Sequence, residues 1–217
     1  MPKNAERSRR EKMYTCAQCR IHSCRSGNLE NMPGNCPCGE DQSEIRELYK
    51  DELTGKLAYQ SALVEAERYC EKTRLEETMD FAQRCGFKKL GLAFCLGLAK
   101  EAGVLTKILE HNGFEVHSVI CKNGSTPKEF MGIEECQKIR PGTYEPMCNP
   151  VGQATLLNRT GTELNIVVGL CVGHDSLFIK YSDAPVTVFA VKDRVLAHNP
   201  LGAIYLADGF YKKKLFK

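Results

Sequence analysis

Residues 163–175, with the sequence ELNIVVGLCVGHD, decide the fold class of this 217-residue chain. The stretch begins with a nearly unbroken apolar run at 164–170, which is typical of a strand buried on both faces of a parallel sheet. The run stops on a thiol, a glycine, an imidazole and a carboxylate, which are Cys171, Gly173, His174 and Asp175. Open α/β sheets bind ligands at this carboxyl edge. The stretch therefore predicts a metal or reactive-thiol centre at the edge of an α/β sheet.

Three further strands and several helices are predicted around this stretch. The strands are expected at residues 88–95, 114–121 and 185–191. Helices are expected at 98–112 and 151–159, and a short one is capped by Thr126 and ends near Gly132. A strand, a helix of about four turns and a second strand make a right-handed unit with parallel strands. We therefore expect an α/β fold, with a small, doubly wound parallel sheet in the flavodoxin-like strand order 2-1-3-4.

Residues 41–86, which precede the sheet, have a helical pattern. Thr73-x-x-Glu76 forms a capping box that opens one helix, and Gly55 is expected to break or bend another. The chain thus divides into three predicted parts. These are a cysteine-rich metal-binding module at residues 1–40, a helical connector at 41–86 and the α/β domain at 87–217.

The first module has cysteines in the pattern Cys16-x2-Cys19-x4-Cys24-x11-Cys36-x-Cys38. A segment this short and rich in proline and glycine builds no apolar core, but metal binding can supply its folding energy. The expected ligands are Cys16, Cys19, Cys24 and Cys36, with Cys38 or His22 as substitutes for one of them. Zinc and iron–sulfur clusters use the same thiolates, so the pattern leaves the metal open.

A second group of cysteines is predicted at the sheet edge. The first three strands each end on a cysteine, namely Cys95, Cys121 and Cys171. Neighbouring strands of a sheet lie about 4.8 Å apart. Cys148 precedes a helix start, where the helix dipole favours a thiolate. We expect these four cysteines to share one iron–sulfur cluster or zinc site.

The residues beyond Cys171 are the candidates for catalysis at this site. His174 and Asp175 could serve as a ligand or proton donor over the centre, or simply as loop-capping residues. Each cysteine also has an ordinary alternative role, because cysteine is among the most buried residue types and packs as a small apolar side chain.

Composition restricts the class of protein. A net charge of +3 and an apolar fraction of 42% suit an ordinary globular protein without a membrane partner. The N-terminal residues have no apolar segment of the secretory kind, so we expect a cytoplasmic location. In a reducing cytosol, 12 cysteines indicate metal ligands or redox thiols rather than disulfides. Residues 3–12 are basic but lack aromatic side chains, which favours a solvated tail over a nucleic-acid arm.

Three segments of the chain resemble a known family. Residues 148–158 (CNPVGQATLLN), 163–175 (ELNIVVGLCVGHD) and 191–200 (VKDRVLAHNP) look like a family of uncharacterised microbial proteins common in anaerobes. This family carries a domain-of-unknown-function label and is described as metal-binding. The resemblance covers nearly the whole chain, and the spacing of Cys16, Cys19, Cys24 and Cys36 is similar to the family's start, whereas Cys38 has no place in that pattern. It implies metal binding and an anaerobic setting, without a reaction.

Two classes of function fit these features. The first is a cytoplasmic metal-binding protein with two cysteine-ligated centres, which acts on a small molecule by redox or sulfur chemistry or meets a redox partner. The alternative is a zinc-stabilised binding module without catalysis, or a thiol-rich metal chelator or sensor. An NTPase and a dinucleotide-binding protein are disfavoured, because neither glycine-rich phosphate motif is present.

Overall fold

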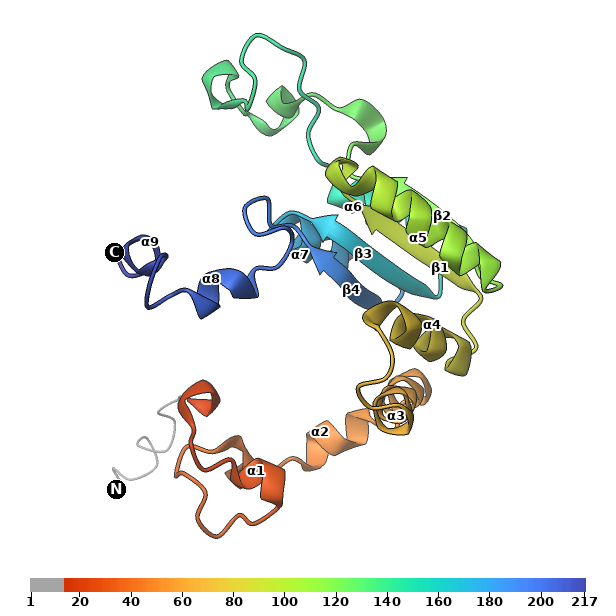
Figure 1. Cartoon of the computed structure of the whole chain (residues 1–217). Helices are drawn as coiled ribbons and strands as arrows, with labels where there is room; N and C mark the ends of the chain where they lie inside the picture. The colour runs from red at the N-terminus through yellow and green to blue at the C-terminus, as the bar shows by residue number, and fades with distance from the viewer. Residues whose placement is uncertain (1–13) are drawn as a thin grey trace, which may run out of the picture. The chain divides into compact units, whose positions relative to one another are not determined.

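A four-stranded sheet lies in the second of two structural units. The computed structural model describes residues 14–217, and its units are Met1–Tyr59 and Gln60–Lys217. The strands are β1 (Lys89–Phe94), β2 (Glu115–Ile120), β3 (Leu164–Leu170) and β4 (Val186–Val191). Their order is β2-β1-β3-β4 and every pairing is parallel, which confirms the predicted sheet (Figure 1).

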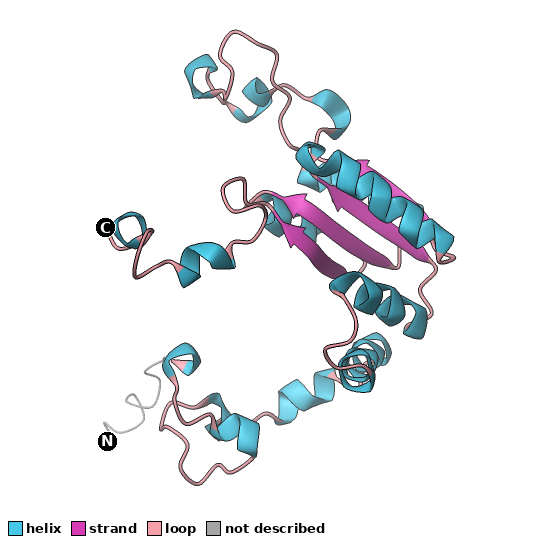
Figure 2. Cartoon of the chain, in the orientation of Figure 1, coloured by secondary structure: helices cyan, strands magenta, loops and turns pink. Residues whose placement is uncertain are grey.

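Helices cover both faces of this sheet, as expected of a doubly wound fold (Figure 2). Ala82 of α4 (Arg74–Arg84) and Leu105 of α5 (Ala99–His111) pack on one face, in a cluster with Leu90, Leu92 and Ile166. On the other face, α6 (Pro150–Thr160) and α7 (His174–Tyr181) supply Ala154, Leu157 and Phe178, which pack with Ala93 and Val167. The carboxyl ends of the strands thus emerge between two apolar layers.

Two local predictions are wrong in instructive ways. The residues after Cys171 were expected to form a loop, but His174 begins α7. The segment after Thr126 was expected to be a helix, but it forms only the 3-10 turn Lys128–Met131, since Pro127 has an extended backbone. Further 3-10 turns lie at Leu96–Leu98, Asn123–Ser125 and Glu135–Gln137.

Residues 122–147 form an arm that leaves the sheet after β2 and returns before α6. An isolated bridge joins Pro127 to Pro146, and Lys128 pairs with Glu145. Further out, the buried Lys138 ammonium lies 2.7 Å from Glu135. Figure 1 shows this arm extending from the same edge of the sheet as the chain that follows β4, which continues into α8 (Leu201–Tyr205) and α9 (Lys212–Leu215).

The first unit contains short elements around the cysteine pattern. These are the 3-10 turns Cys16–Gln18 and Pro37–Gly39, α1 (Ser23–Ser26), α2 (Ser43–Leu48) and the start of α3 (Glu52–Glu67). The expected break at Gly55 is absent, because α3 runs through it. A side chain there would come within 2.7 Å of the Tyr49 carbonyl, so glycine permits a close approach rather than a bend.

The predicted capping box is present at the start of α4, where Thr73 and Glu76 bond reciprocally. The basic stretch at residues 3–12 lies outside the described residues. Within the part of the chain that the structure describes, no helix is both long and apolar enough to cross a membrane.

Gly91 and Gly103 provide a matched test of packing in the sheet. A Cβ added at Gly91 would lie 1.8 Å from Oδ1 of the fully buried Asn165, which accepts a bond from Thr162. We expect Gly91→Ala to lower the free energy of unfolding by about 2–4 kcal/mol through overpacking and loss of this bond. Gly103 lies in α5 with open space around it, so Gly103→Ala should raise the free energy by about 0.5–1 kcal/mol.

Urea denaturation of Gly91→Ala and Gly103→Ala measures the difference between their free energies of unfolding. Equal stabilities would show that the sheet adjusts to the extra methyl group.

Candidate functional site

Two of the predicted cysteines follow β1 and β2 at the same level. The register pairs Phe94 with Ile120, so the next residues, Cys95 and Cys121, are neighbours, and the Cys121 N–H donates to the Phe94 carbonyl at 2.9 Å. Both side chains are buried, with 9% of Cys95 and 3% of Cys121 exposed. They pack in the apolar cluster on the α6 face, so burial alone would make them core thiols.

Cys148 lies beside Cys121, at the point where the arm of residues 122–147 returns to the sheet. The N–H of the next residue, Asn149, donates to the Cys121 carbonyl at 2.8 Å. The Asn149 side chain then caps α6 by accepting from the Gly152 N–H at 2.8 Å. Cys148 itself is half-buried and packs against the cluster that contains Cys95 and Cys121. The helix start and the strand end therefore place its sulfur beside theirs.

Cys121 lies between the other two sulfurs. Its hydrogen bonds, first to Cys148 and then to Cys95, raise the pKa of its thiol together with burial. The same bonds are the largest cause that lowers the pKa of Cys148 to about 3 and that of Cys95 to about 5. These three sulfurs are named here the thiol row, in which hydrogen bonding to Cys121 is the largest cause that lowers the pKa of both neighbours.

Positive charges surround the thiol row. His174 bonds to the Cys148 sulfur, which raises the pKa of the imidazole and lowers that of the thiol. The ammonium of Lys122 also stabilises the Cys148 thiolate, and that of Lys192 stabilises Cys95. The sequence pointed to His174, whereas Lys122 was missed because only the fold brings it to this edge.

Backbone N–H groups of the turn after β1 reach two of the sulfurs. Leu96 donates to the Cys121 sulfur at 3.3 Å, and the N–H of Gly97 helps to lower the pKa of Cys95. A Cβ at Gly97 would lie 3.4 Å from Nζ of Lys192 and 4.0 Å from the Cys95 sulfur. The glycine thus leaves room for the lysine beside the thiolate.

Gln153 of α6 fixes the ends of β1 and β2 relative to each other. Its side chain is fully buried, and its Nε2 donates to the carbonyls of Phe94 at 3.2 Å and Val119 at 2.7 Å. Its Oε1 has no hydrogen-bond partner among the described residues. Sequence reasoning missed this residue, although a polar side chain beside Ala154 and Leu157 on the inner face of a helix was a signal.

Cys171 lies beyond the level of the thiol row in the direction of β3. The register pairs Phe94 with Val168, so the residue next to Cys95 on β3 is Gly169 and not Cys171. The Cys171 sulfur instead accepts a bond from the Arg194 guanidinium at 3.1 Å. Of the four sheet-edge cysteines, the structure thus joins three and places the fourth beside an arginine.

Asp193 holds Arg194 in place after β4. Its carboxylate accepts the N–H groups of Val195 at 2.9 Å and Leu196 at 2.8 Å, and its own N–H donates to the His198 ring at 3.1 Å. These bonds form a local turn that presents the arginine to Cys171. The motif at 191–200 was recognised in the sequence, but its link to Cys171 depends on the neighbouring positions of β3 and β4.

The second catalytic candidate, Asp175, has a different environment from His174. Its carboxylate accepts the N–H of Ser176 at 2.8 Å in the first turn of α7. Its charge contributes to raising the pKa of His174. Of the two candidates, His174 is the one that contacts a thiol.

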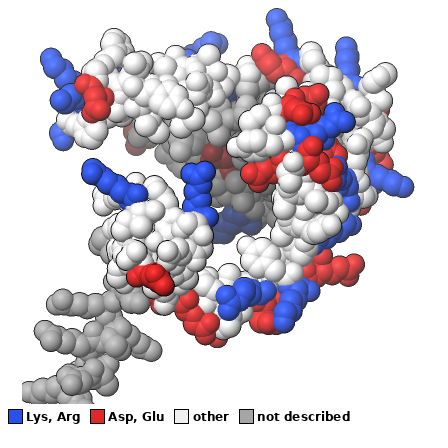
Figure 3. Space-filling model, turned by 60° about the horizontal axis from the view of Figure 1, so that its bottom comes forward, with Lys and Arg blue, Asp and Glu red and all other residues white. Residues whose placement is uncertain are grey.

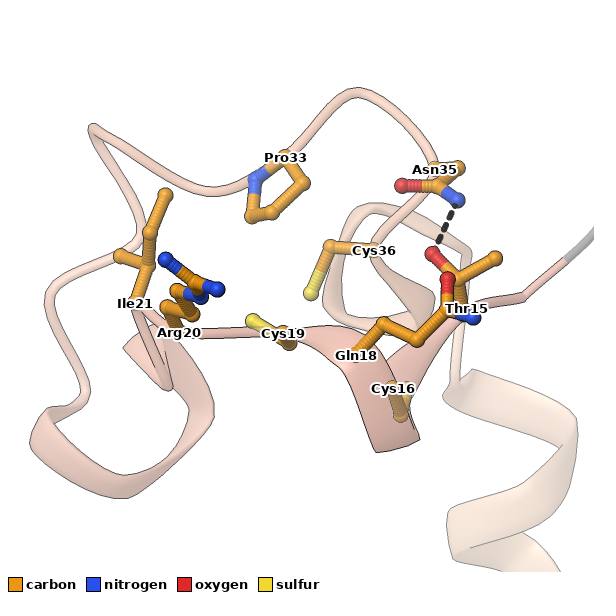
Figure 4. A pocket seen from close by; sticks show the side chains of 9 residues that line it. All are labelled: Thr15, Cys16, Gln18, Cys19, Arg20, Ile21, Pro33, Asn35 and Cys36. Atoms are coloured by element: carbon orange, nitrogen blue, oxygen red, sulfur yellow. Dashed lines mark hydrogen bonds between the residues drawn. The ribbon is translucent and has the colours of Figure 1, made fainter. Parts of the chain in front are cut away.

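In the first unit, three of the predicted ligands line one cavity. It has a volume of about 300 Å³ and is lined by Cys16, Cys19 and Cys36 with Arg20 and neighbouring residues. The side chain of Cys36 points toward Cys19 in Figure 4. The backbone of His22 donates to the Cys19 sulfur at 3.5 Å.

Cys38 belongs to the same gathering of thiols. Its hydrogen bond to Cys36 is the largest cause that raises the pKa of the Cys38 thiol. The charges of Cys36, Cys24 and Cys16 act in the same direction. The structure thus places Cys38 close to three of the four predicted ligands.

Neither group of cysteines is arranged around a common point. Within residues 14–217, no three His, Cys, Asp or Glu side chains have the geometry to hold a metal ion. The thiol row is instead a hydrogen-bonded arrangement with two low-pKa sulfurs. Such thiolates are both nucleophiles and ligands for soft metals.

A comparison with known proteins decides the family. The family described as "Protein of unknown function (DUF1847)" matches residues 36–189. The chain belongs to this family. It is also 48% identical over 203 residues to an uncharacterized protein of Methanocaldococcus jannaschii, an alignment that spans 93% of this chain and 98% of the relative. No solved structure matches the chain.

The extent of the DUF1847 match bears on the two cysteine groups. Residues 36–189 contain the thiol row, Cys171 and His174, but not Cys16, Cys19 or Cys24. The alignment with the archaeal relative extends beyond this region, because it covers nearly the whole chain.

Proposed function

We propose that the chain is a metal-binding protein with cysteine-ligated centres at the sheet edge and in the first unit, each holding an iron–sulfur cluster or zinc. The observation that carries the proposal is the thiol row, in which strand register and a helix start place three sulfurs together. A metal binds the thiolate form of cysteine, which the low pKa values of Cys95 and Cys148 favour.

The donor set fits a soft metal. Thiolates select zinc and iron–sulfur clusters over harder cations. A bound metal would deprotonate Cys121, whose thiol is otherwise neutral between two charged neighbours. Because the sulfurs do not surround one point, binding requires the side chains to rotate about χ1.

The surrounding cations fit the charge of such a centre. Four thiolates and either Zn²⁺ or a doubly charged cubane carry a net charge of about −2, which Lys122, Lys192 and Arg194 offset. Hydrogen bonds to the sulfurs, such as that from Leu96 to Cys121, tune the reduction potential of clusters. When bound, the metal supplies electron transfer or polarisation of a ligand. The protein supplies His174, whose hydrogen bond to the Cys148 sulfur raises the pKa of the imidazole.

The two centres together suggest a division of roles. The centre in the first unit would relay electrons from a redox partner, and the sheet-edge centre would meet a small-molecule substrate. We place the protein in the cytoplasm, where thiols stay reduced. Nucleic acid is not proposed as a partner, because acidic and basic side chains are interspersed on the face drawn in Figure 3.

Anaerobic purification of the full chain tests this function. We expect metal bound by the wild type at both centres, with iron, acid-labile sulfide and a brown colour for clusters or a colourless zinc protein otherwise. Cys148→Ser should lose the metal of the sheet edge alone. Cys136→Ser is the control, because Cys136 is exposed and belongs to neither group.

The outcome also separates the rival functions. Zinc confined to the first unit would favour a zinc-stabilised binding module, and metal that exchanges freely at both sites would favour a chelator or sensor. Wild-type protein that carries no metal at either centre would overturn the proposal.

A further inference from the structure

Backbone pairing places Cys121 next to two other cysteines. Cys121 follows β2 beside Cys95, and the bond from the Asn149 N–H to the Cys121 carbonyl brings Cys148 next to it. Backbones joined by such bonds lie about 4.8 Å apart, and a disulfide needs Cα atoms roughly 4.4–6.8 Å apart. The side chain of Cys121 makes hydrogen bonds to both neighbouring sulfurs. Cys121 can therefore form a disulfide with a neighbour without movement of the backbone.

Exposure distinguishes the three sulfurs of the thiol row. Cys121 is 3% exposed and Cys95 is 9% exposed, and both pack in the apolar cluster on the α6 face. Cys148 is only half-buried, so it is the member of the row that a molecule in solution can reach. A reachable thiol next to a buried one is the arrangement in which an attacking cysteine is paired with a resolving cysteine.

The charges that act on the reachable thiol are mostly positive. The ammonium of Lys122 acts on Cys148, and the exposed Arg194 is influenced by the charge of Cys148 in turn. Two carboxylates belong to the neighbouring segments, Asp175 in α7 and Asp193 after β4, and both accept backbone N–H groups. The surroundings of Cys148 therefore favour the approach of an anion over that of a cation.

We infer that the metal-free chain carries out thiol–disulfide exchange with small anionic disulfides, with Cys148 as the attacking cysteine and Cys121 as the resolving one. The Cys148 thiolate attacks one sulfur of a disulfide R–S–S–R, which forms a mixed disulfide and releases R–S⁻. The Cys121 sulfur then attacks the Cys148 sulfur, which forms the Cys121–Cys148 disulfide and releases the second R–S⁻. This second leaving group takes the proton of Cys121.

The electrons balance without a metal. The small disulfide is reduced to two thiols, and the two cysteines are oxidised to one disulfide. This activity goes beyond the proposed metal binding, because it uses the free thiols of the sheet edge.

Site-resolved mapping of the full chain tests the order of attack. Metal-free, reduced protein is mixed with oxidised glutathione, which is anionic, then quenched with an alkylating agent, digested and read by mass spectrometry. We expect the wild type to give the linked Cys121–Cys148 peptides. Cys121→Ser should accumulate Cys148 joined to glutathione, because no resolving thiol follows. Cys148→Ser should leave the buried Cys121 reduced.

Cys95→Ser is the matched control for the loss of a thiol from the row. Cys95 is buried like Cys121 and bonds to it, but it takes no part in the exchange. Cys95→Ser should therefore still form the Cys121–Cys148 disulfide. Circular dichroism checks that the variants are folded, and the wild-type map decides the assignment by itself if one of them is not.

The charge of the small disulfide tests the substrate class. Cystamine is the cationic counterpart of oxidised glutathione, and each rate at Cys148 is divided by the rate of the same disulfide with mercaptoethanol. In Cys121→Ser at low salt, we expect oxidised glutathione to react about tenfold faster than cystamine, and added salt should reduce the ratio. Arg194→Gln in the same background should lower the ratio. Arg159→Gln should not, because Arg159 lies exposed at the far end of α6.

Contrary results would remove defined parts of the inference. Wild type in which Cys148 stays reduced, or in which Cys121 pairs with Cys95, would overturn the assigned roles of the cysteines. Equal normalised rates for the two disulfides would overturn the anionic substrate class. Neither result changes the metal content of separately purified protein, so failure of the exchange activity is distinct from failure of the proposed metal binding.

Discussion

A chelator added to the metal-loaded chain should make residues 14–40 sensitive to trypsin, while residues 87–217 stay protected. Within residues 14–40, the structure buries only Ser23, which is polar, so no apolar core holds this segment. Structural zinc contributes about 10–16 kcal/mol to the folding of such small modules, far more than any single packing change. Cleavage after Arg20 and Arg25, read by mass spectrometry, measures the effect.

Matched variants separate metal binding from chelator side effects. Cys16→Ser should reproduce the cleavage without chelator, whereas Cys136→Ser should leave it at the wild-type level. Protection of residues 14–40 in the metal-free chain would contradict the role of the metal in folding this module.

In the metal-free chain, iodoacetamide should alkylate Cys148 at nearly the same rate at pH 6 and pH 8. An ordinary thiol with a pKa of about 8.5 would react roughly 75-fold faster at the higher pH. The difference arises because the Cys121 and His174 hydrogen bonds lower the pKa of Cys148 to about 3, so its thiolate is already formed at pH 6. Peptide mapping after timed quenching gives the rate at Cys148 itself.

The lowered pKa of Cys148 also determines how the stability of the fold changes with pH. Since the folded pKa lies below the unfolded one, the thiolate stabilises the fold fully above about pH 8.5. This contribution is lost as the pH falls toward about 3. His174→Gln should restore part of the pH dependence of alkylation, and the exposed His111 at the end of α5 provides the control His111→Gln. A wild-type rate that rises like that of an ordinary thiol would disprove the thiolate assignment.

The sheet was predictable because its signals are local and periodic. Apolar runs ended by cysteine, with a helix between the first two strands, indicated parallel strands, and the observed order β2-β1-β3-β4 agrees with the prediction. Cys95 and Cys121 lie beside each other because parallel β1 and β2 end at one edge, whereas Cys148 joins them through the start of α6.

The rest of the site depends on features that no local pattern encodes. Cys171 lies two residues beyond Gly169, the neighbour of Cys95 in the register of β1 with β3, and the positive φ of Gly169 had no signal in the sequence. Arg194 and Lys192 become neighbours of the thiols only because β4 pairs with β3. Strand ends could therefore be placed from the sequence, whereas the relative heights of those ends and the contacts between charged side chains and thiols could not.

The two cysteines that flank the arm, Cys121 and Cys148, have a consequence for handling the protein in air. Cys121 and Cys148 are in contact and close the loop of residues 122–147, so oxygen can oxidise this pair to a disulfide. A cross-link around a loop of this size stabilises a fold by about 3–4 kcal/mol in the chain-entropy treatment. Aerobic material would then be more heat-resistant than reduced protein, and yet unable to bind metal at the sheet edge until a reductant reopens the pair.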